Sequence, residues 1–291
     1  MKIGVIGGGS IGLFISGWLS SVHHITIYVR RKEQKEKINK NGLFFSHYHK
    51  SFPVKSMLIE EMKSEDCLII CVKQPHVSGV ISLIPTVNAR IPLIFLQNGM
   101  GHIDSIKNRT QPVFLGVIEH GARRLSDTTV EHTGEGKVKL ASFSNCGLNL
   151  YELASQLNQN GFPVEIAEDW SQLLAEKLII NAVINPLTAL FGCLNEDVLR
   201  NPYIRKLANE LCKEAALVLG LNYSEQWDRV EKITFSTGKN ISSMLKDIRE
   251  SQMTEIEAIS GYLRKNTDKE LPYTSFVYNC IKALEMKKGI N

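Results

Sequence analysis

Residues 1–12 read MKIGVIGGGSIG, a short apolar segment that runs directly into the pattern Gly7-x-Gly9-x-x-Gly12. In nucleotide-binding βαβ units, the first glycine permits a tight turn, the second lets backbone N–H groups approach a pyrophosphate, and the third lets the next helix pack closely on the strand. The start of that helix also favours negative charge. The pattern predicts a dinucleotide-binding loop formed by Gly7, Gly8, Gly9, Ser10, Ile11 and Gly12.

The flanking segments distinguish this loop from a glycine-rich turn with a purely structural role. Ile3–Ile6 has the pattern of a buried strand, Ile11–Leu19 carries the apolar face of a helix, and Ile25–Val29 supplies a second strand. A strand, loop, helix and strand in this order favour dinucleotide binding over a plain turn.

The end of the second strand predicts which dinucleotide binds. Where a unit that prefers NAD has Asp or Glu, about 20 residues past the motif, this chain has Arg30, Arg31 and Lys32, and no carboxylate before Glu33. A guanidinium binds a phosphate through two parallel hydrogen bonds, whereas a carboxylate repels it. We therefore expect NADP(H), with Arg30 as the phosphate contact, and interpret Lys32 to Lys37 as a solvated charged run.

Composition indicates an ordinary two-domain protein of 291 residues, with 43% hydrophobic residues, 22% charged residues and a net charge of +4. The charge is too small to indicate a nucleic-acid partner, and no basic stripe interleaved with aromatic residues occurs. The glycine motif interrupts the apolar opening, so we expect no secretory signal and a cytoplasmic location. The six cysteines form no CxxC pair or Cys/His cluster, so neither a bound metal nor a disulfide framework is expected.

The first half of the chain alternates strands and helices. Cys67–Val72 and Leu93–Leu96 are continuous apolar runs, as in parallel strands buried on both faces, and ligands bind at the carboxyl ends of such strands. Val113–Ile118, Val138–Ala141 and Val164–Ile166 are expected to be further strands, the last near the sheet edge.

Long helical patterns begin after Asp169, a good N-cap with Gln172 three residues later. The predicted fold class is α/β: an N-terminal Rossmann-type doubly wound sheet over residues 1–167, followed by an all-α C-terminal domain over residues 168–291. A cleft between two domains is the default position for a ligand. The predicted helices are Trp170–Leu190, Val198–Leu219, Ser224–Val230, Ser242–Leu263 and Ser275–Met286.

The first of these helices carries the most informative polar residues. Lys177, Asn181 and Asn185 fall at positions i, i+4 and i+8 and share one face. Pro186 should kink the helix there, and apolar surroundings would lower the pKa of Lys177 toward that of a general acid. The alternative is that Lys177 reaches solvent while the asparagines satisfy buried backbone groups. Leu178–Asn195 has no charge, but its polar residues favour a buried helix over a membrane span.

A second polar row repeats at intervals of four on the helix predicted from Ser242. It consists of Ser243, Asp247, Ser251 and Glu255. A polar stripe on an amphipathic helix usually faces water. We expect this for Asp247 and Ser251 and keep Ser243 and Glu255 as candidate functional residues.

Several segments spread over nearly the whole chain form a recognisable set. They are GGGSIG, Cys71-Val-Lys73, Gln97-Asn-Gly-Met-Gly101, Gly121-Ala122, EKLIIN ending at Asn181, INPLTAL from Ile184 to Leu190, NISSMLKDIR from Asn240 to Arg249, and Thr254-Glu255-Ile256. With these segments the chain resembles the ketopantoate reductase (2-dehydropantoate 2-reductase) family. The glycine motif is shared with many dehydrogenases, but its combination with INPLTAL and SSMLKDIR is far more specific.

The resemblance implies NADPH-dependent reduction of 2-dehydropantoate to (R)-pantoate, a step toward pantothenate and coenzyme A. It implies a small keto-acid substrate and no nucleic-acid or membrane partner, and leaves monomer and homodimer open. Lys177 would donate the proton to the carbonyl oxygen, and Glu255 would help to position Lys177 and contact the cofactor side. Lys73 and Ala122 would line the cofactor groove, and Asn98 would sit between cofactor and substrate. The substrate would be held by Asn181, Asn185, Asn195 and Ser243.

Two positions depart from the family pattern. Ser10 stands where Ala is common, and His76 stands where Gln is common. Ser10 is small enough to be tolerated, and we expect His76 to be a surface residue. Two alternative functions stay open: a related reductase of another branched 2-keto or 3-hydroxy acid, and a regulator that binds NADP without catalysis. The second should lack the proton donor, so Lys177 argues against it.

Overall fold

The computed structural model describes residues 1–84, 90–144 and 149–290. The chain forms two compact units. The first contains Met1–Gln97 and His102–Leu173, and the second contains Asn98–Gly101 and Leu174–Asn291. The boundary between the units falls inside one long helix, α6 (Trp170–Phe191). The short segment Asn98–Gly101 belongs to the second unit, although the strands before and after it belong to the first.

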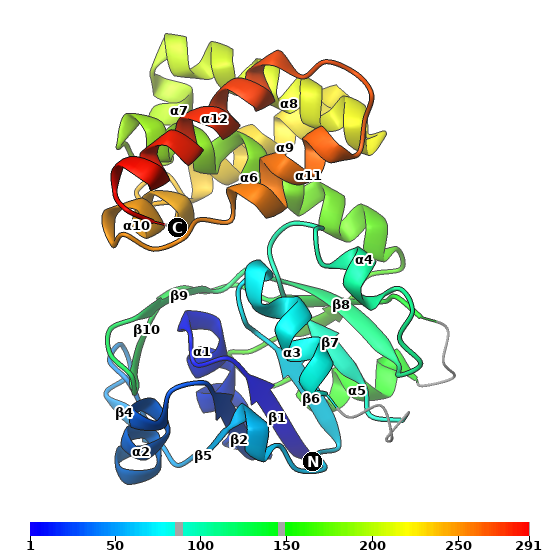
Figure 1. The fold of residues 1–291 in the computed structure, drawn as a ribbon, viewed down its shortest axis with the longest axis vertical. Helices are drawn as coiled ribbons and strands as arrows, with labels where there is room; N and C mark the ends of the chain where they lie inside the picture. The colour runs from blue at the N-terminus through cyan, green and yellow to red at the C-terminus, as the bar shows by residue number, and fades with distance from the viewer. Residues whose placement is uncertain (85–89, 145–148, 291) are drawn as a thin grey trace. The chain divides into compact units, whose positions relative to one another are not determined.

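The first unit contains a mostly parallel eight-stranded sheet (Figure 1). Its strands are β1 (Lys2–Ile6), β2 (His24–Val29), β5 (Lys55–Leu58), β6 (Cys67–Ile70), β7 (Leu93–Phe95), β8 (Val113–Ile118), β11 (Val138–Ser142) and β12 (Val164–Ile166). The order β5-β2-β1-β6-β7-β8 is parallel throughout, whereas β11 runs antiparallel to β8 and carries β12 at the edge. This order is that of the Rossmann fold, with the direction of strand addition reversing beside β1. The predicted fold class is confirmed, including the edge position of Val164–Ile166.

The central strands of this sheet are buried because their sequences are apolar on both faces. Every residue of β6, β7 and β8 is buried. Helices connect the parallel strands, as the parallel arrangement requires. They are α1 (Ser10–Leu19), α2 (Lys32–Asn41), α3 (Val77–Leu83) and α4 (Ile103–Ile106), with α5 (Leu150–Leu157) preceding β12.

A second sheet of four strands was not anticipated from the sequence. Its order is β4-β3-β10-β9, and its strands are β3 (Leu43–Phe45), β4 (Lys50–Phe52), β9 (Gly121–Arg124) and β10 (Thr129–Gly134). Helix α1 packs against this sheet, with the Phe14 ring stacked on Phe45 at a centroid distance of 5.8 Å. Two strands have only three residues, and the inward position His132 hides the apolar alternation of β10, so the usual strand signal is weak.

The second unit is helical (Figure 1). Its helices are α6, α7 (Asp197–Arg200), α8 (Pro202–Leu219), α9 (Tyr223–Ser236), α10 (Ser243–Arg249), α11 (Tyr262–Lys265) and α12 (Pro272–Lys287), with a π-helical turn at Glu257–Gly261. Asp169 caps α6, because its Oδ1 accepts hydrogen bonds from the N–H groups of Ser171 and Gln172. Pro186 lies inside the continuous helix. In length and composition α6 resembles a membrane span, yet 72% of its most apolar window is buried inside the structure.

Two predicted helices are interrupted. The helix predicted over Val198–Leu219 breaks between α7 and α8, because Pro202 disfavours a helical conformation at Asn201, which instead caps α8. The helix predicted over Ser242–Leu263 ends at Arg249, and Ser251 adopts a left-handed conformation with φ of 53°. Glu255 therefore does not share a helical face with Ser243, and the regular polar row inferred from the spacing was wrong.

The five cysteines in the described part of the chain are free thiols, and Cys67 and Cys212 are buried. Cys146 lies outside the described residues.

Candidate functional site

The glycine-rich loop follows β1 at the point where the strand order reverses. Gly7 has φ of +117°, and its N–H donates to the Tyr28 carbonyl oxygen at 2.9 Å. A Cβ atom at Gly12 would lie only 1.8 Å from the Gly7 carbonyl oxygen, so α1 approaches the loop more closely than any side chain allows. At Gly9, the N-cap of α1, no described atom lies within 4 Å of such a Cβ position, which leaves its backbone open to a ligand.

Neighbouring elements hold this loop in place. Gln34 on α2 donates from Nε2 to the Gly8 carbonyl oxygen at 2.9 Å, and the Ser10 hydroxyl accepts from the Arg124 N–H of β9 at 3.1 Å. The first turn of a helix leaves N–H groups without partners inside the helix, and its dipole favours an anion there. The loop, including Ile11 in the first turn, thus has the shape and polarity that a pyrophosphate requires.

Cations gather where β2 ends. Arg30 is exposed. Arg31 forms an ion pair with Asp127, and Lys37 reaches the other oxygen of the same carboxylate at 3.0 Å. Arg124 also contacts Asp127, whose side chain is only 10% exposed. Burial alone would raise the pKa of Asp127, but hydrogen bonds from Lys37 and Arg31 hold it below the usual value.

Sequence reasoning missed this cluster because Asp127 lies 96 residues from Arg31 and no motif marks it. Lys37, interpreted as solvated, is 57% exposed and still contacts Asp127. Lys32 agrees with that interpretation, since its side chain is 80% exposed.

A side-chain amide links the carboxyl ends of β6 and β7 near the glycine-rich loop. Gln97 donates from Nε2 to the carbonyl oxygens of Ile70 and Val72, at 2.9 and 3.0 Å. Lys73 follows directly and is exposed, as is His76. Ala122 is half-buried on β9 and lies opposite His132 of β10.

The polar face of α6 is present as predicted by the helical spacing. Lys177 and Asn181 are half-buried, and Asn185 is 8% exposed. The Nδ2 atom of Asn181 is buried and has no hydrogen-bond partner among the described residues. A buried donor without a partner is costly. This amide nitrogen therefore satisfies no backbone group among the described residues and is available to a ligand.

The two most specific sequence motifs meet in the second unit. The Thr188 hydroxyl of α6 lies 2.7 Å from the Ser242 hydroxyl and 2.8 Å from the Ile184 carbonyl oxygen. Ser242 in turn caps α10 by accepting from the Leu245 N–H at 3.1 Å. This contact places Ser243, the exposed first residue of α10, beside α6.

Asn195 follows α6 and is buried. Its Nδ2 donates to the Thr237 hydroxyl at 3.0 Å, while its Oδ1 is buried without a partner in the described part of the chain. Like Asn181, it therefore has hydrogen-bonding capacity that none of the described residues uses.

Asn98 and Glu255 are joined directly. Asn98 Nδ2 donates to Glu255 Oε2 at 2.9 Å, across 157 residues of sequence. The following residue, Gly99, has φ of +77°, and a Cβ atom there would lie 2.3 Å from the Ala258 carbonyl oxygen. This close approach explains why Asn98–Gly101 groups with the second unit, although the sequence-based domain limits assign it to residues 1–167.

The candidate residues thus divide between the two units. The first holds the glycine loop, Arg30, Lys73 and Ala122, and the second holds Asn98, Lys177, Asn181, Asn185, Asn195, Ser243 and Glu255. Over residues 1–84, 90–144 and 149–290, no three His, Cys, Asp or Glu side chains come together as metal ligands would.

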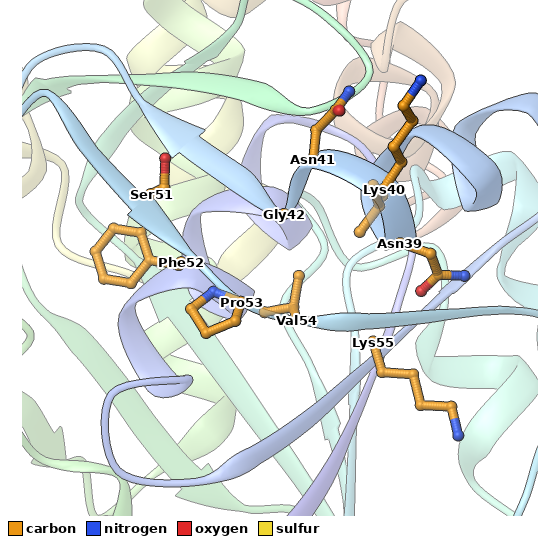
Figure 2. Close-up of a pocket in the computed structure, with 10 residues that line it drawn as sticks. Asn39, Lys40, Asn41, Gly42, Ser51, Phe52, Pro53, Val54 and Lys55 are labelled. Carbon is orange, nitrogen blue, oxygen red and sulfur yellow. The ribbon is translucent and has the colours of Figure 1, made fainter.

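A pocket of about 600 Å³ lies elsewhere in the first unit, between the end of α2 and the segment from β4 to β5. Figure 2 shows its lining, in which the Lys40 and Lys55 side chains extend in opposite directions. None of the candidate residues lines it, and its charged groups do not converge on a common point.

Comparison of the sequence with known protein families shows which family the chain belongs to. The family described as "Ketopantoate reductase PanE/ApbA" matches residues 3–145, and its C-terminal counterpart matches residues 169–285. The chain belongs to the ketopantoate reductase family. The resemblance seen in the sequence motifs is confirmed.

Curated relatives match the chain over its length. The 2-dehydropantoate 2-reductase of Bacillus subtilis is 37% identical over 98% of both chains. That of Listeria monocytogenes is 34% identical over 100% of this chain and 99% of its own.

Solved structures agree with these relationships. The probable 2-dehydropantoate 2-reductase of Bacillus subtilis superposes with a TM-score of 0.88 at 36% identity, covering 98% of this chain and 100% of that one. A D-mandelate dehydrogenase solved with NADH and anilino(oxo)acetate has a TM-score of 0.90 at 21% identity, covering 99% and 100% of the two chains. At that identity, the second match shows a shared fold only.

Proposed function

We propose that this chain catalyses the NADPH-dependent reduction of 2-dehydropantoate to (R)-pantoate, a step toward pantothenate and coenzyme A. The observation that carries the proposal is the polar face of α6, where Lys177 is followed by the buried amide nitrogen of Asn181, which has no hydrogen-bond partner among the described residues. Full-length similarity to 2-dehydropantoate 2-reductases supports the same reaction.

The first unit would hold the cofactor. The glycine loop would bind the pyrophosphate through backbone N–H groups, and Lys73 and Ala122 would line the rest of the groove. NADPH is favoured over NADH because exposed Arg30 stands at the end of β2, and because three cations surround the single carboxylate of Asp127 there. A bound nicotinamide supplies the hydride.

The second unit would hold the substrate. Lys177 would donate a proton to the keto oxygen as negative charge develops there, and its ammonium group would stabilise that charge. Asn181, Asn185, Asn195 and Ser243 would bind the carboxylate and hydroxyl groups of the substrate. Asn98 would sit between cofactor and substrate, and Glu255, to which it is hydrogen-bonded, would contact the cofactor side and help to position Lys177. We propose that residues 1–167 bind the cofactor, and that residues 168–291 bind the substrate and donate the proton.

A panel of keto acids assayed with NADPH tests this function. We expect NADPH oxidation to be fastest with ketopantoate, and (R)-pantoate to be the product. A faster rate with another branched 2-keto acid would assign the chain to a related reductase. NADPH binding without oxidation by any keto acid would indicate a regulator and would contradict the proposal.

A further inference from the structure

A buried carboxylate outside the candidate residues fixes the segment that carries Glu255. Glu285 on α12 is 2% exposed. Its Oε1 accepts hydrogen bonds from the Thr254 N–H at 3.0 Å and from the Thr254 hydroxyl at 2.7 Å. Its Oε2 accepts from Lys282 Nζ at 2.6 Å. Burial would raise the pKa of Glu285, but the hydrogen bonds from Lys282 and Thr254 hold it below the ordinary value, so the carboxylate is ionised at neutral pH.

The Thr254 hydroxyl acts on both sides of Glu255. It donates to Glu285 and accepts from the Ile256 N–H at 3.2 Å. One hydroxyl group therefore fixes the backbone immediately before and immediately after Glu255. Thr254 itself is 3% exposed, so water cannot readily replace these bonds.

A second contact from α12 holds the segment that follows. Tyr278 donates to Glu257 Oε2 at 2.6 Å, and Glu257 begins the π-helical turn. Tyr278 and Glu285 lie seven positions apart, two helical turns along one face of α12. The same helix face thus anchors the chain on both sides of Glu255.

Stability alone does not explain a buried carboxylate at this place. Burying a charge is costly, and well-packed apolar residues often stabilise a core equally well. The hydrogen bonds of Glu285 instead impose a non-helical path on Thr254 and Glu255, directly before the helical residue Ile256 and within the segment where the sequence pattern predicts a continuous helix. That path presents Glu255 to Asn98, at 2.9 Å.

We infer that Glu285 and Thr254 are positioning residues that fix the side chain of Glu255 against Asn98 for the reduction. This inference rests on the proposed function of Glu255. It assigns a role in the reaction to α12, which contains none of the residues proposed to touch substrate or cofactor.

The variants Thr254→Val and Thr254→Ser test it. Valine keeps the shape and loses the hydroxyl, so the Ile256 N–H loses its acceptor and Glu285 Oε1 keeps only the bond from the Thr254 N–H. We expect kcat/KM for ketopantoate to fall about tenfold, which corresponds to the loss of about one buried hydrogen bond. Serine restores the hydroxyl and should restore kcat/KM to within about twofold, even if lost packing lowers the melting temperature.

Glu214 provides a matched control. Its carboxylate accepts from the N–H groups of Tyr273 and Thr274 at the start of α12, at 3.0 and 2.7 Å, and so is also structural. Glu214→Gln should lower the melting temperature and leave kcat/KM within about twofold of wild type, because this carboxylate does not act through Glu255.

A double-mutant cycle with Glu255→Gln separates positioning from general stability. If Thr254 acts through Glu255, Thr254→Val should have little further effect on kcat/KM in the Glu255→Gln background. The inference would be overturned if the two substitutions lowered kcat/KM independently, so that their separate factors multiplied in the double variant. A folded Thr254→Val variant with wild-type kcat/KM would overturn it as well.

The side-chain amide of Asn98 gives a readout that does not depend on catalysis. Its NMR signal should shift in Thr254→Val and stay in place in Thr254→Ser. An unchanged signal in Thr254→Val would overturn the positioning role, whereas a wild-type protein that reduces no keto acid would overturn the proposed function instead.

Discussion

Lys177 is the residue on which the proposed chemistry depends. Replacing it with alanine removes the proton donor and the positive charge that would stabilise the developing alkoxide. Because general acids typically contribute about 100-fold or more, we expect Lys177→Ala to lower kcat by at least that factor, with a much smaller change in the affinity for NADPH. Steady-state kinetics and NADPH titration measure the two effects. Lys206→Ala, at an exposed position of α8, is the control; a wild-type kcat in Lys177→Ala would remove the assigned role.

Arg30 is the residue expected to distinguish the two dinucleotides. Arg30→Ala would remove a charge-assisted contact to the 2′-phosphate of NADPH. We expect this substitution to raise the KM for NADPH by about tenfold and to leave the KM for NADH nearly unchanged. Lys32→Ala is the matched control, because Lys32 is also a cation, two residues away, with an 80% exposed side chain. Equal effects of Arg30→Ala and Lys32→Ala on KM for NADPH would show that only general charge matters.

At the residue scale, the sequence predicts what local spacing determines. The glycine loop and the shared face of Lys177, Asn181 and Asn185 follow from the geometry of turns and helices. The bond between Asn98 and Glu255 and the pairing of Arg31 with Asp127 join residues far apart in sequence. Such contacts depend on how whole elements pack, so no single-sequence pattern indicates them.

At the scale of elements, two glycines at the junction of β1 and α1 should respond in opposite ways to replacement by alanine. Gly12→Ala places a methyl group against the Gly7 carbonyl oxygen, and we expect a loss of about 2 kcal/mol or more in unfolding free energy. Gly9→Ala meets no described atom within 4 Å, so the fold should tolerate it while NADPH binding weakens. Urea unfolding and NADPH titration of both variants measure this contrast, and equal destabilisation by the two would refute it.

Elements with strong local signals were predictable, and those determined by tertiary contacts were not. The buried parallel strands and α6 stand out as apolar runs. The second sheet does not, because its strands are short and His132 takes an inward position. The break after α10 follows from Thr254 binding to Glu285, a contact across 31 residues that outweighs the helical periodicity of Ser242–Leu263.

At the scale of the whole molecule, buried histidines should make stability depend on pH. His120 is 6% exposed, stacks on Phe162 at 5.4 Å and lies 3.2 Å from a ring nitrogen of His132. Burial and the neighbouring His132 lower the pKa of His120 to about 4. Burial lowers the pKa of His102 to about 4 as well.

Because these pKa values are lower in the folded state, the unfolded chain binds more protons below about pH 6.5. Stability should therefore be complete above that pH and decline as pH falls toward 4, by at most about 1.4 kcal/mol per pH unit for each histidine. Urea unfolding at several pH values should show a shallower decline in His120→Phe than in wild type. His76→Gln, which alters an exposed histidine, should follow wild type. An identical pH dependence in His120→Phe and wild type would rule out this source of acid sensitivity.

The most direct test of the account compares NADPH and NADH as reductants of ketopantoate by the purified protein. The account predicts rapid oxidation of NADPH, with kcat/KM about tenfold or more above that for NADH, since a charge-assisted phosphate contact distinguishes the two. Equal rates with both dinucleotides would contradict the assigned cofactor. No ketopantoate-dependent oxidation of either would contradict the assigned reaction.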